Sequence, residues 1–422
     1  MLLKLLLAPI WLFFVLLQAF YWTYLWQLKE YRFDRLRSAT LEQGWRFLVP
    51  LHFYRPVFST KAVMVAFAGI VCSTVMATFS PLLWILTPFW ISFFVLILAV
   101  PTLGYKRYIF RKASKKLKSF LDLKVIGVTG SYGKSSTKEL IAGVLSAKYK
   151  TAKTPKNNNT LVGVCRAVLS LKKDTQFFIV EIGAYKKGEI RKICQLVRPG
   201  IGVITGLCPQ HLALFGSMEN LVAAKLELAE AIGKKGTMFL NRDDTLLKKY
   251  VGEIRAQIIW YSSGADYAVA NLAGAAKVGE HFAVPKNKIS QALKNIPFGI
   301  DTVTAKNGLK ILNDCYNSNP IGFEYALEQL SKANRKNKIL ITRGIIELGE
   351  ESAKIHKGLG QKAGKVADLV IVTKREFAGY LGGRLVSDPK DVAKIVKQFP
   401  PQETAVLLEG RLNKWLIQSL HN

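Results

Sequence analysis

The feature that most restricts the fold of this chain is a set of long apolar stretches near its start. They cover residues 2–26, 62–79 and 82–100. Each is close to the roughly 20 residues that a helix needs to cross a bilayer. We therefore expect a membrane region over residues 1–120, with about three transmembrane helices.

A cleaved signal peptide and a buried soluble core are the alternative interpretations of these stretches. The first stretch is too long for a signal peptide, and no small-residue cleavage site follows it. It is rich in aromatic residues up to Trp26, as expected of residues at a membrane interface. The length of the other two stretches and their positively charged flanks favour membrane helices over a soluble core.

Positive charge is concentrated beside the apolar stretches. The formal net charge is +31, and many basic residues lie between the first and second stretches or directly after the third. Basic loops usually face the cytoplasm. Ser80 and Pro81 predict a tight hairpin that would place both basic segments on one side. We expect a multi-pass protein of the cell membrane, inner or plasma, with the chain from about Thr102 onward in the cytoplasm.

Nucleic acid is an alternative partner for so basic a chain. The sequence contains no zinc-finger spacing and no aromatic–basic RNA-binding pattern, so the membrane is the favoured partner. The 5 cysteines are scattered and form no CxxC pair. This usage suits a reducing compartment and argues against a disulfide framework or a zinc site.

From Lys124 onward, short β-rich runs alternate with helical stretches. Runs such as KVIGVTG, FFIVEIG and IGVITG are followed by a second set that begins near Gly308 with GLKILND. Such alternation is typical of α/β domains with parallel sheets. We expect a P-loop-type parallel-sheet domain over residues 121–300 and a Rossmann-like α/β domain over residues 301–422, with a short helical linker between the two sets of runs.

The first of these runs leads into the sequence VIGVTGSYGKSSTKEL. Gly130 and Gly133 allow backbone amides to approach phosphate oxygens, and the following helix presents its positive N-terminal end. Lys134 can reach the outer phosphates, and the Ser135 hydroxyl can bind Mg²⁺. The standard spacing would require glycine at position 128, which is Val128. Gly-Lys-Ser-Ser between a strand and a helix still favours a phosphate loop over a generic glycine turn.

Two polar residues follow the next predicted strands. Glu181 lies at the end of the strand predicted in FFIVEIG, and His211 lies beyond the strand predicted in IGVITG. The carboxyl ends of parallel strands are where ligands gather, and a carboxylate there can hold Mg²⁺ directly or through water. A lone acid or histidine would be weak evidence by itself, because many such residues are structural.

The chain contains an ordered series of motifs that includes GVTGSYGKSSTKEL, IVEIGAYKKGEI, NRDD, LNDCYNSNP and IIELGEES. In this series it is similar to the Mur ligases, the ATP-dependent amide ligases of cell-wall synthesis. The resemblance extends from about Val125 to the C-terminus and is strongest to the members that add D-alanyl-D-alanine to a UDP-muramoyl tripeptide. It implies ATP and Mg²⁺ as cofactors.

The resemblance also implies roles for individual residues. The nucleotide would be bound by Thr129, Gly130, Ser131, Gly133, Lys134, Ser135, Ser136, Asn241, Asn271, Asp314 and Asn317. Metal would be held by Ser135, Glu181 and His211, and substrate would be contacted by Asn159, Thr160, Tyr316 and Asn319. Lys134, His211 and Lys225 would be catalytic, with Lys225 at the position of the family's carbamylated lysine. A carbamate would offer oxygens and negative charge to a hard cation, whereas an ammonium beside Lys134 would be repelled.

The substrate sites depart from the family pattern. The family's N-terminal domain, which grips the UDP sugar, is not recognisable, and the membrane region stands in its place. Glu409, Gly410 and Arg411 occupy the positions of a family Lys-Gly-Ser. We expect a membrane-anchored acid–amino-acid ligase that acts through an acyl phosphate in peptidoglycan precursor synthesis. Its carboxylate substrate would be lipid-linked or held by a partner cell-wall enzyme, and its second substrate an amino acid or dipeptide.

Three other interpretations stay open. The chain could be a ligase for another amino-acid polymer, or a non-catalytic nucleotide-binding scaffold for cell-wall enzymes. The Lys134, Glu181, His211 and Lys225 set argues against a scaffold, which would not need all of them. The weakest of the three interpretations is an ATP-driven transporter, because the apolar stretches carry almost no ionisable residues to line a transport path.

Overall fold

The structure, a computed structural model, describes residues 2–44, 48–50, 54–156, 158–262, 267–296, 299–315 and 318–421. The chain forms two compact units, Met1–Arg111 and Lys112–Asn422.

The first unit is helical. Its elements are α1 (Leu2–Leu28), α2 (Phe33–Gln43), α3 (Thr60–Phe79), the 3₁₀ helix η2 (Pro81–Leu86), α4 (Thr87–Ile97) and α5 (Ala99–Leu117), which continues into the second unit. Helices α1, α3 and α4 pack together through buried apolar side chains that include Trp22, Val65 and Ile91. The Trp26 indole also donates a hydrogen bond to the Ser92 hydroxyl at 3.2 Å.

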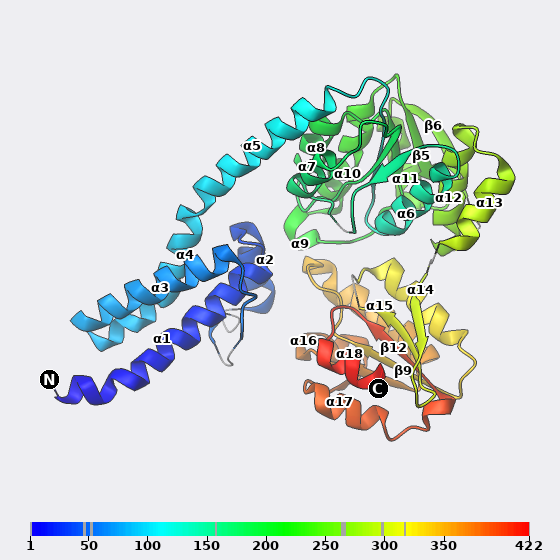
Figure 1. Ribbon diagram of the computed structural model, residues 1–422. Coiled ribbons are helices and arrows are strands. Elements are labelled where there is room, and N and C mark those ends of the chain that lie inside the picture. The colour runs from blue at the N-terminus through cyan, green and yellow to red at the C-terminus, as the bar shows by residue number, and fades with distance from the viewer. Residues whose placement is uncertain are drawn as a thin grey trace. The chain divides into compact units, whose positions relative to one another are not determined.

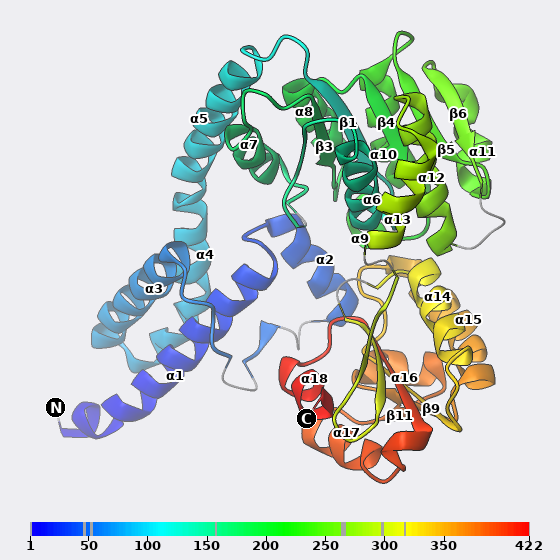
Figure 2. The same cartoon turned by 45° about the vertical axis from the view of Figure 1, so that its right-hand side comes forward.

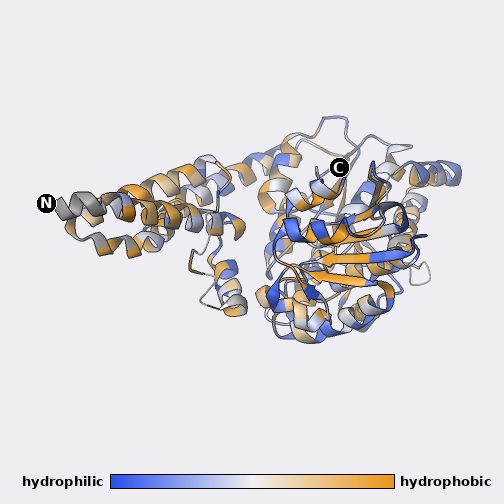
Figure 3. Ribbon diagram, turned by 90° about the horizontal axis from the view of Figure 1, so that it is seen from below, coloured by the Kyte–Doolittle hydropathy of each residue, from blue (hydrophilic) through white to orange (hydrophobic). Residues whose placement is uncertain are grey.

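The outward faces of these helices are also apolar (Figure 3). Phe67, Phe79 and Leu82 are 68%, 75% and 77% exposed. Exposed apolar surface on this scale marks a face that contacts something other than water. On length and composition alone, the stretches Ala8–Leu28 and Thr60–Phe79 and the longer Thr87–Leu117 are candidate membrane spans.

The connection between the second and third stretches differs from the predicted tight hairpin. Ser80 ends α3, and Pro81 begins the six-residue 3₁₀ helix η2. The third candidate span therefore begins at Thr87 rather than at residue 82. Proline suits this position because it lacks the N–H that a continuing helix would need.

The second unit contains a parallel sheet with strand order β2-β3-β1-β4-β5-β6. Its strands are β1 (Lys124–Thr129), β2 (Thr151–Lys153), β3 (Phe177–Glu181), β4 (Ile201–Ile204), β5 (Thr237–Asn241) and β6 (Gln257–Tyr261). Its helices are α6 (Lys134–Ser146), α7 (Leu161–Leu169), α8 (Glu189–Val197), α9 (Leu212–Phe215), α10 (Met218–Ile232), α11 (Thr245–Tyr250), α12 (Tyr267–His281) and α13 (Lys286–Asn295), with the 3₁₀ helix η3 (Val251–Glu253).

Helices cover both faces of this sheet (Figure 1). Helices α6, α12 and α13 pack on one face, and α7, α8 and α10 lie on the other. The helical segment expected between the two sets of strands is therefore part of this layer, because α12 packs directly against α6. Burial on both faces explains why the strands are almost continuously apolar.

A second, mixed sheet follows with strand order β11-β10-β9-β12-β8-β7 (Figure 2). Its strands are β7 (Asp301–Thr304), β8 (Lys310–Asp314), β9 (Asn337–Thr342), β10 (Leu369–Val372), β11 (Arg384–Leu385) and β12 (Thr404–Glu409). Only β7 runs antiparallel among these paired strands. The helices are α14 (Pro320–Ser331), α15 (Ser352–Val366), α16 (Arg375–Leu381), α17 (Pro389–Val396) and α18 (Lys414–His421), with the 3₁₀ helices η4 (Gly349–Glu351) and η5 (Pro401–Glu403). The two sheets confirm the expected α/β class.

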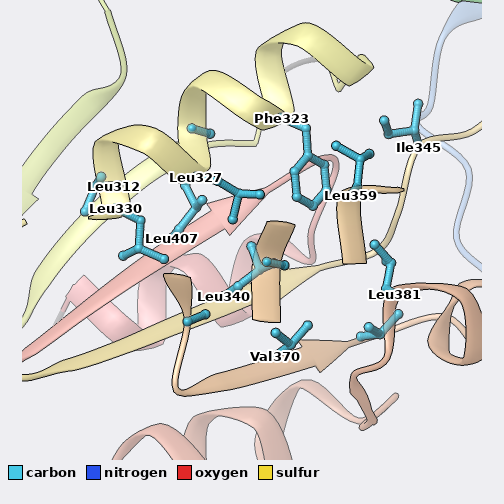
Figure 4. Packing of buried hydrophobic residues seen from close by; sticks show 14 of the residues in the cluster. Leu312, Phe323, Leu327, Leu330, Leu340, Ile345, Leu359, Val370, Leu381 and Leu407 are labelled. Carbon is cyan, nitrogen blue, oxygen red and sulfur yellow. The ribbon is translucent and has the colours of Figure 1, made fainter. Parts of the chain in front are cut away.

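Alternate residues of the central strands enter different cores. Leu340 and Leu407 pack with α14, α15 and α16, where Phe323 and Leu359 contribute (Figure 4). Their strand neighbours, such as Ile339, face α17 and α18. This alternation follows from the two-residue period of a β-strand. Parallel pairing of β12 with β8 and β9 brings the carboxyl ends of these three strands to one edge.

Candidate active site

The phosphate loop joins β1 to α6. Gly130 and Gly133 have φ values of +146° and +68°, conformations that favour glycine. A Cβ at Gly130 would lie 2.1 Å from Thr205 Oγ1, and one at Gly133 would lie 2.7 Å from Asn271 Oδ1. Glycine therefore suits both positions for two reasons: the backbone conformation, and the close approach of a neighbouring side chain to the place where a Cβ would lie.

Hydrogen bonds hold this loop in shape. Thr129 Oγ1 donates to the Ile182 carbonyl at 2.9 Å. Ser131 donates through its hydroxyl to the Cys208 carbonyl at 2.9 Å and through its backbone N–H to the Gly206 carbonyl at 2.8 Å. These bonds tie the loop to the carboxyl ends of β3 and β4, while Ser135 and Ser136 occupy the first turn of α6.

Lys134 folds back over the loop. Its ammonium donates to the Gly130 carbonyl at 2.8 Å and to the Ser131 carbonyl at 3.1 Å. Burial lowers the pKa of Lys134, and the nearby Glu181 carboxylate opposes the shift. The ammonium thus lies directly at the loop whose amides face a phosphate-binding position.

Glu181 lies at the end of β3 and is 1% exposed. Its Oε2 is 3.2 Å from the ammonium of Lys138, a residue that is itself 0% exposed. Its Oε1 accepts a hydrogen bond from Asn159 Nδ2 at 3.1 Å. The predicted substrate residue Asn159 therefore contacts the predicted metal residue Glu181, whereas Thr160 caps α7 by accepting from the Gly163 N–H.

Lys225 lies on α10 and is 2% exposed. Its ammonium is 5.9 Å from the centre of the Phe215 ring and makes no ion pair or hydrogen bond with another described residue. Burial, followed by the positive charge of Lys134, lowers the pKa of Lys225 to about 7. A buried ammonium with no paired acid is costly, so much of this lysine is neutral near pH 7.

His211 begins α9 beyond the end of β4. Its Nδ1 is 2.5 Å from Glu347 Oε2, and its ring contacts that of Tyr185 edge-to-face at 4.9 Å. Burial lowers the pKa of His211, although Glu347 opposes the shift, and Lys225 and Lys134 lower it further. The structure therefore brings His211, Lys134 and Lys225 within electrostatic reach of one another.

The two asparagines expected near the nucleotide brace the loop region. Asn271 Oδ1 accepts a hydrogen bond from Thr137 Oγ1 at 2.9 Å, next to Gly133. Asn241 Oδ1 accepts from the Asp243 N–H at 3.0 Å at the end of β5. Both side chains are thus engaged in local structure.

Two of the four residues expected from the last domain are described. Asp314 ends β8, and Asn319 caps α14 while its Oδ1 lies 3.6 Å from Cys208 Sγ. This contact joins α14 to the segment that binds Ser131. Tyr316 and Asn317 lie outside the described residues.

Several residues that support this site were not predicted from the sequence. Asp244 accepts hydrogen bonds from the Tyr132 hydroxyl at 3.3 Å and the Leu207 N–H at 2.6 Å, and so links the phosphate loop to the loop after β4. The Lys138 ammonium pairs with the Glu181 carboxylate, and the Glu347 carboxylate contacts the His211 ring. Each of them carried a signal in the sequence: Lys138 lies one helical turn after Lys134, and Asp244 and Glu347 lie in the motifs NRDD and IIELGEES.

Ser135, Glu181 and His211 are the side chains of this site that could hold Mg²⁺ together with phosphate oxygens. Ser135 and Glu181 supply oxygen donors, which Mg²⁺ prefers, and His211 adds a nitrogen. No group of three or more His, Cys, Asp or Glu side chains within the described ranges could hold a metal by itself. Mg²⁺ is commonly bound by one or two carboxylates together with phosphates and water.

Comparison with known proteins identifies the class to which this fold and site belong. The Mur ligase middle domain matches residues 128–297, and the Mur ligase glutamate ligase domain matches residues 300–411. The chain therefore belongs to the Mur ligase family, as its motifs predicted.

Among characterised relatives, the chain is similar to UDP-N-acetylmuramoyl-tripeptide–D-alanyl-D-alanine ligase of Bacillus subtilis, with 28% identity over 57% of this chain and 60% of the relative. It thus spans less than two thirds of that relative. The solved MurF structure from Acinetobacter baumannii shares the fold, with a TM-score of 0.69, 22% identity and coverage of 75% of this chain and 80% of that one. The Thermotoga maritima MurF structure with ADP has a TM-score of 0.65, 23% identity and coverage of 75% and 82%.

Proposed function

We propose that this protein is a membrane-anchored, ATP- and Mg²⁺-dependent ligase that joins a carboxylate to the amine of an amino acid or dipeptide. Membership of the Mur ligase family supports the reaction type. The names of its relatives favour a peptidoglycan precursor as the carboxylate substrate and D-alanyl-D-alanine as the amine.

The observation that carries this proposal is the state of Lys225. It is buried, has no paired acid among the described residues and has a pKa of about 7. A neutral amine is the form that reacts with CO₂ to give a carbamate, and a carbamate would replace an uncompensated buried cation with an anion. A scaffold that only binds nucleotide has no need of such a lysine beside Lys134 and His211.

In the first step, a carboxylate oxygen of the substrate attacks the γ-phosphorus of ATP, and ADP leaves. Lys134 and the amides of the phosphate loop stabilise negative charge on the transferring group. Ser135, Glu181 and His211 would hold Mg²⁺, which when bound supplies positive charge to the phosphate oxygens.

In the second step, the amine nitrogen attacks the carbonyl carbon of the acyl phosphate, loses a proton and expels phosphate. Water competes for the same carbon, so the site must be closed during this step. The contact between Asn319 and Cys208 supports α14 as part of the closing surface.

We further propose that α1, α3 and the continuous α4–α5 stretch span the cell membrane, with the ligase domains in the cytoplasm. Their length, hydropathy and exposed apolar faces support this arrangement. The carboxylate substrate would then be lipid-linked or presented at the membrane by a partner enzyme.

ADP formation by the purified full-length protein in nanodiscs tests the proposal. Candidate peptidoglycan stem peptides, UDP-linked or lipid-linked, are supplied with ATP, Mg²⁺ and D-alanyl-D-alanine. We expect ADP formation that requires both substrates and that Lys134→Ala abolishes. ATP binding without acceptor-dependent ADP formation would favour the scaffold, and activity only with another acidic acceptor would favour a ligase for a different polymer.

A further inference from the structure

Glu347 lies in the loop between β9 and η4, far from His211 in sequence. Its Oε2 is nevertheless 2.5 Å from His211 Nδ1, and it is 5% exposed. Its carbonyl also accepts a hydrogen bond from the Ala213 N–H at 3.1 Å. The same residue therefore contacts the His211 segment through both its side chain and its backbone.

Both partners of this contact have unusual backbone conformations. Glu347 has φ +65° and His211 has φ +54°, in the left-handed region that residues other than glycine rarely adopt. Such conformations persist only where surrounding structure holds them, and they cluster at functional sites. Strain on both sides of one contact indicates that the position of each side chain is specified.

The contact determines which nitrogen of His211 remains available. Nδ1 is engaged by Glu347, and His211 keeps 27% of its side-chain exposure. Nε2 makes no hydrogen bond to any residue in the described part of the chain. Histidines that bind metals usually donate their second N–H to a carboxylate or carbonyl, which fixes the tautomer and the ring orientation. The Glu347–His211 pair has this arrangement, with the carboxylate on one domain and the imidazole on the other.

We propose that Glu347 is a positioning residue that orients His211 for a divalent cation, so that cation binding requires the C-terminal domain to be seated on the ATP-binding domain. The inference rests on the metal role of His211 in the proposed function. The loop before η4 would thus help to assemble the metal site. Gly349 lies beside the same segment, because a Cβ there would be in ordinary van der Waals contact with Ala213, 3.5 Å from its nitrogen.

The test measures the affinity of the full-length protein for Mn²⁺ by electron paramagnetic resonance, with a non-hydrolysable ATP analogue present. Glu347→Gly removes the carboxylate and suits the left-handed backbone, so it should not destabilise the loop. We expect it to weaken Mn²⁺ binding about 10–100-fold, the usual effect of removing such a partner. Glu347→Gln can still accept a hydrogen bond from Nδ1 and should recover most of the affinity.

Glu350→Gly is the matched control, because Glu350 is an exposed acid of η4 in the same loop. We expect its Mn²⁺ affinity to stay within about twofold of the unmodified protein. A Glu347→Gly variant that also binds Mn²⁺ within twofold of the unmodified protein would overturn the proposal.

A double-mutant cycle separates positioning from a plain tether between domains. If Glu347 acts through His211, Glu347→Gly should change Mn²⁺ affinity by less than about twofold in a His211→Ala background. Equal losses in both backgrounds would overturn the proposal. These Mn²⁺-binding measurements need no acceptor substrate. Their outcome therefore tests the role of Glu347 separately from the assay for ligase activity.

Discussion

Lys225 and Glu409 are buried, unlike most charged side chains. Lys225 is an almost completely buried lysine without a paired acid among the described residues. Glu409 is completely buried at the end of β12, beside Asp314 at the end of β8. Burial raises the pKa of Asp314 to about 6, and burial and Asp314 raise that of Glu409 well above its usual range.

The first prediction concerns Lys225. Lys225→Ala should reduce acceptor-dependent ADP formation at least about 100-fold, because the buried carbamate would be lost. Acetate or another small carboxylate should restore part of the activity by supplying the missing anion. The measurement is ADP formation with increasing acetate, and Lys277→Ala, on the exposed end of α12, is the control. A fully active Lys225→Ala variant would remove the carbamate assignment.

The second prediction concerns pH. Because the pKa of Glu409 is raised in the folded state, the folded protein retains a proton that the unfolded chain releases above its usual pKa of about 4.3. Stability therefore falls as pH rises from that value towards the raised pKa. Glu409→Gln keeps the shape and can still accept from the Ser318 hydroxyl, so it should stabilise the protein at pH 8.

Urea unfolding at pH 5 and pH 8 measures this effect. The stabilisation should be smaller at pH 5, because the raised pKa leaves unmodified Glu409 more protonated in the folded state there than at pH 8. Glu403→Gln, an exposed acid just before β12, should change stability little at either pH. An equal stabilisation by Glu409→Gln at both values would contradict a raised pKa.

At the scale of elements, the alternation of strand and helix predicted β1, β3 and β4 in the first sheet and β8 in the second. It did not predict β2, β6, β7 and α7, of which β2 and β7 have only three and four residues. It gave α12 only as a short helix between the two sets of strands, without a place in the fold. Its small apolar residues, including Ala270 and Ala275, are buried against α6, and periodicity alone cannot say which neighbour a helix face will meet.

Helix α5 gives the third prediction. The Lys116 ammonium donates hydrogen bonds of 2.7 Å to the Leu169 and Leu171 carbonyls at the end of α7. Positive charge at a helix C-terminus is favourable. Lys116→Met should therefore destabilise the ligase unit by about 1–2 kcal/mol and increase proteolysis after α5.

Limited proteolysis and thermal unfolding in detergent measure the change. Lys115→Met is the control, because Lys115 is exposed and has the same charge on the adjacent position of α5. Equal sensitivity of the two variants would show that Lys116 contributes only its charge.

At the scale of the whole molecule, the fourth prediction is the membrane topology. Single cysteines at Ser80 and Lys118, in a variant whose natural cysteines are replaced by serine, should label differently in intact cells. An impermeant maleimide should reach Ser80→Cys from outside and Lys118→Cys only after permeabilisation. Labelling of both from the same side would exclude the proposed orientation.

The sequence by itself determined the α/β class, the family and the phosphate loop, because these depend on local periodicity and on motifs whose residues are adjacent in the chain. Tertiary structure decided which distant side chains meet. The pairs Lys138–Glu181, His211–Glu347 and Asp314–Glu409 form because parallel strands bring their carboxyl ends to one edge and because two domains contact each other. No local pattern encodes those contacts, since each depends on the packing of segments separated by tens of residues or more.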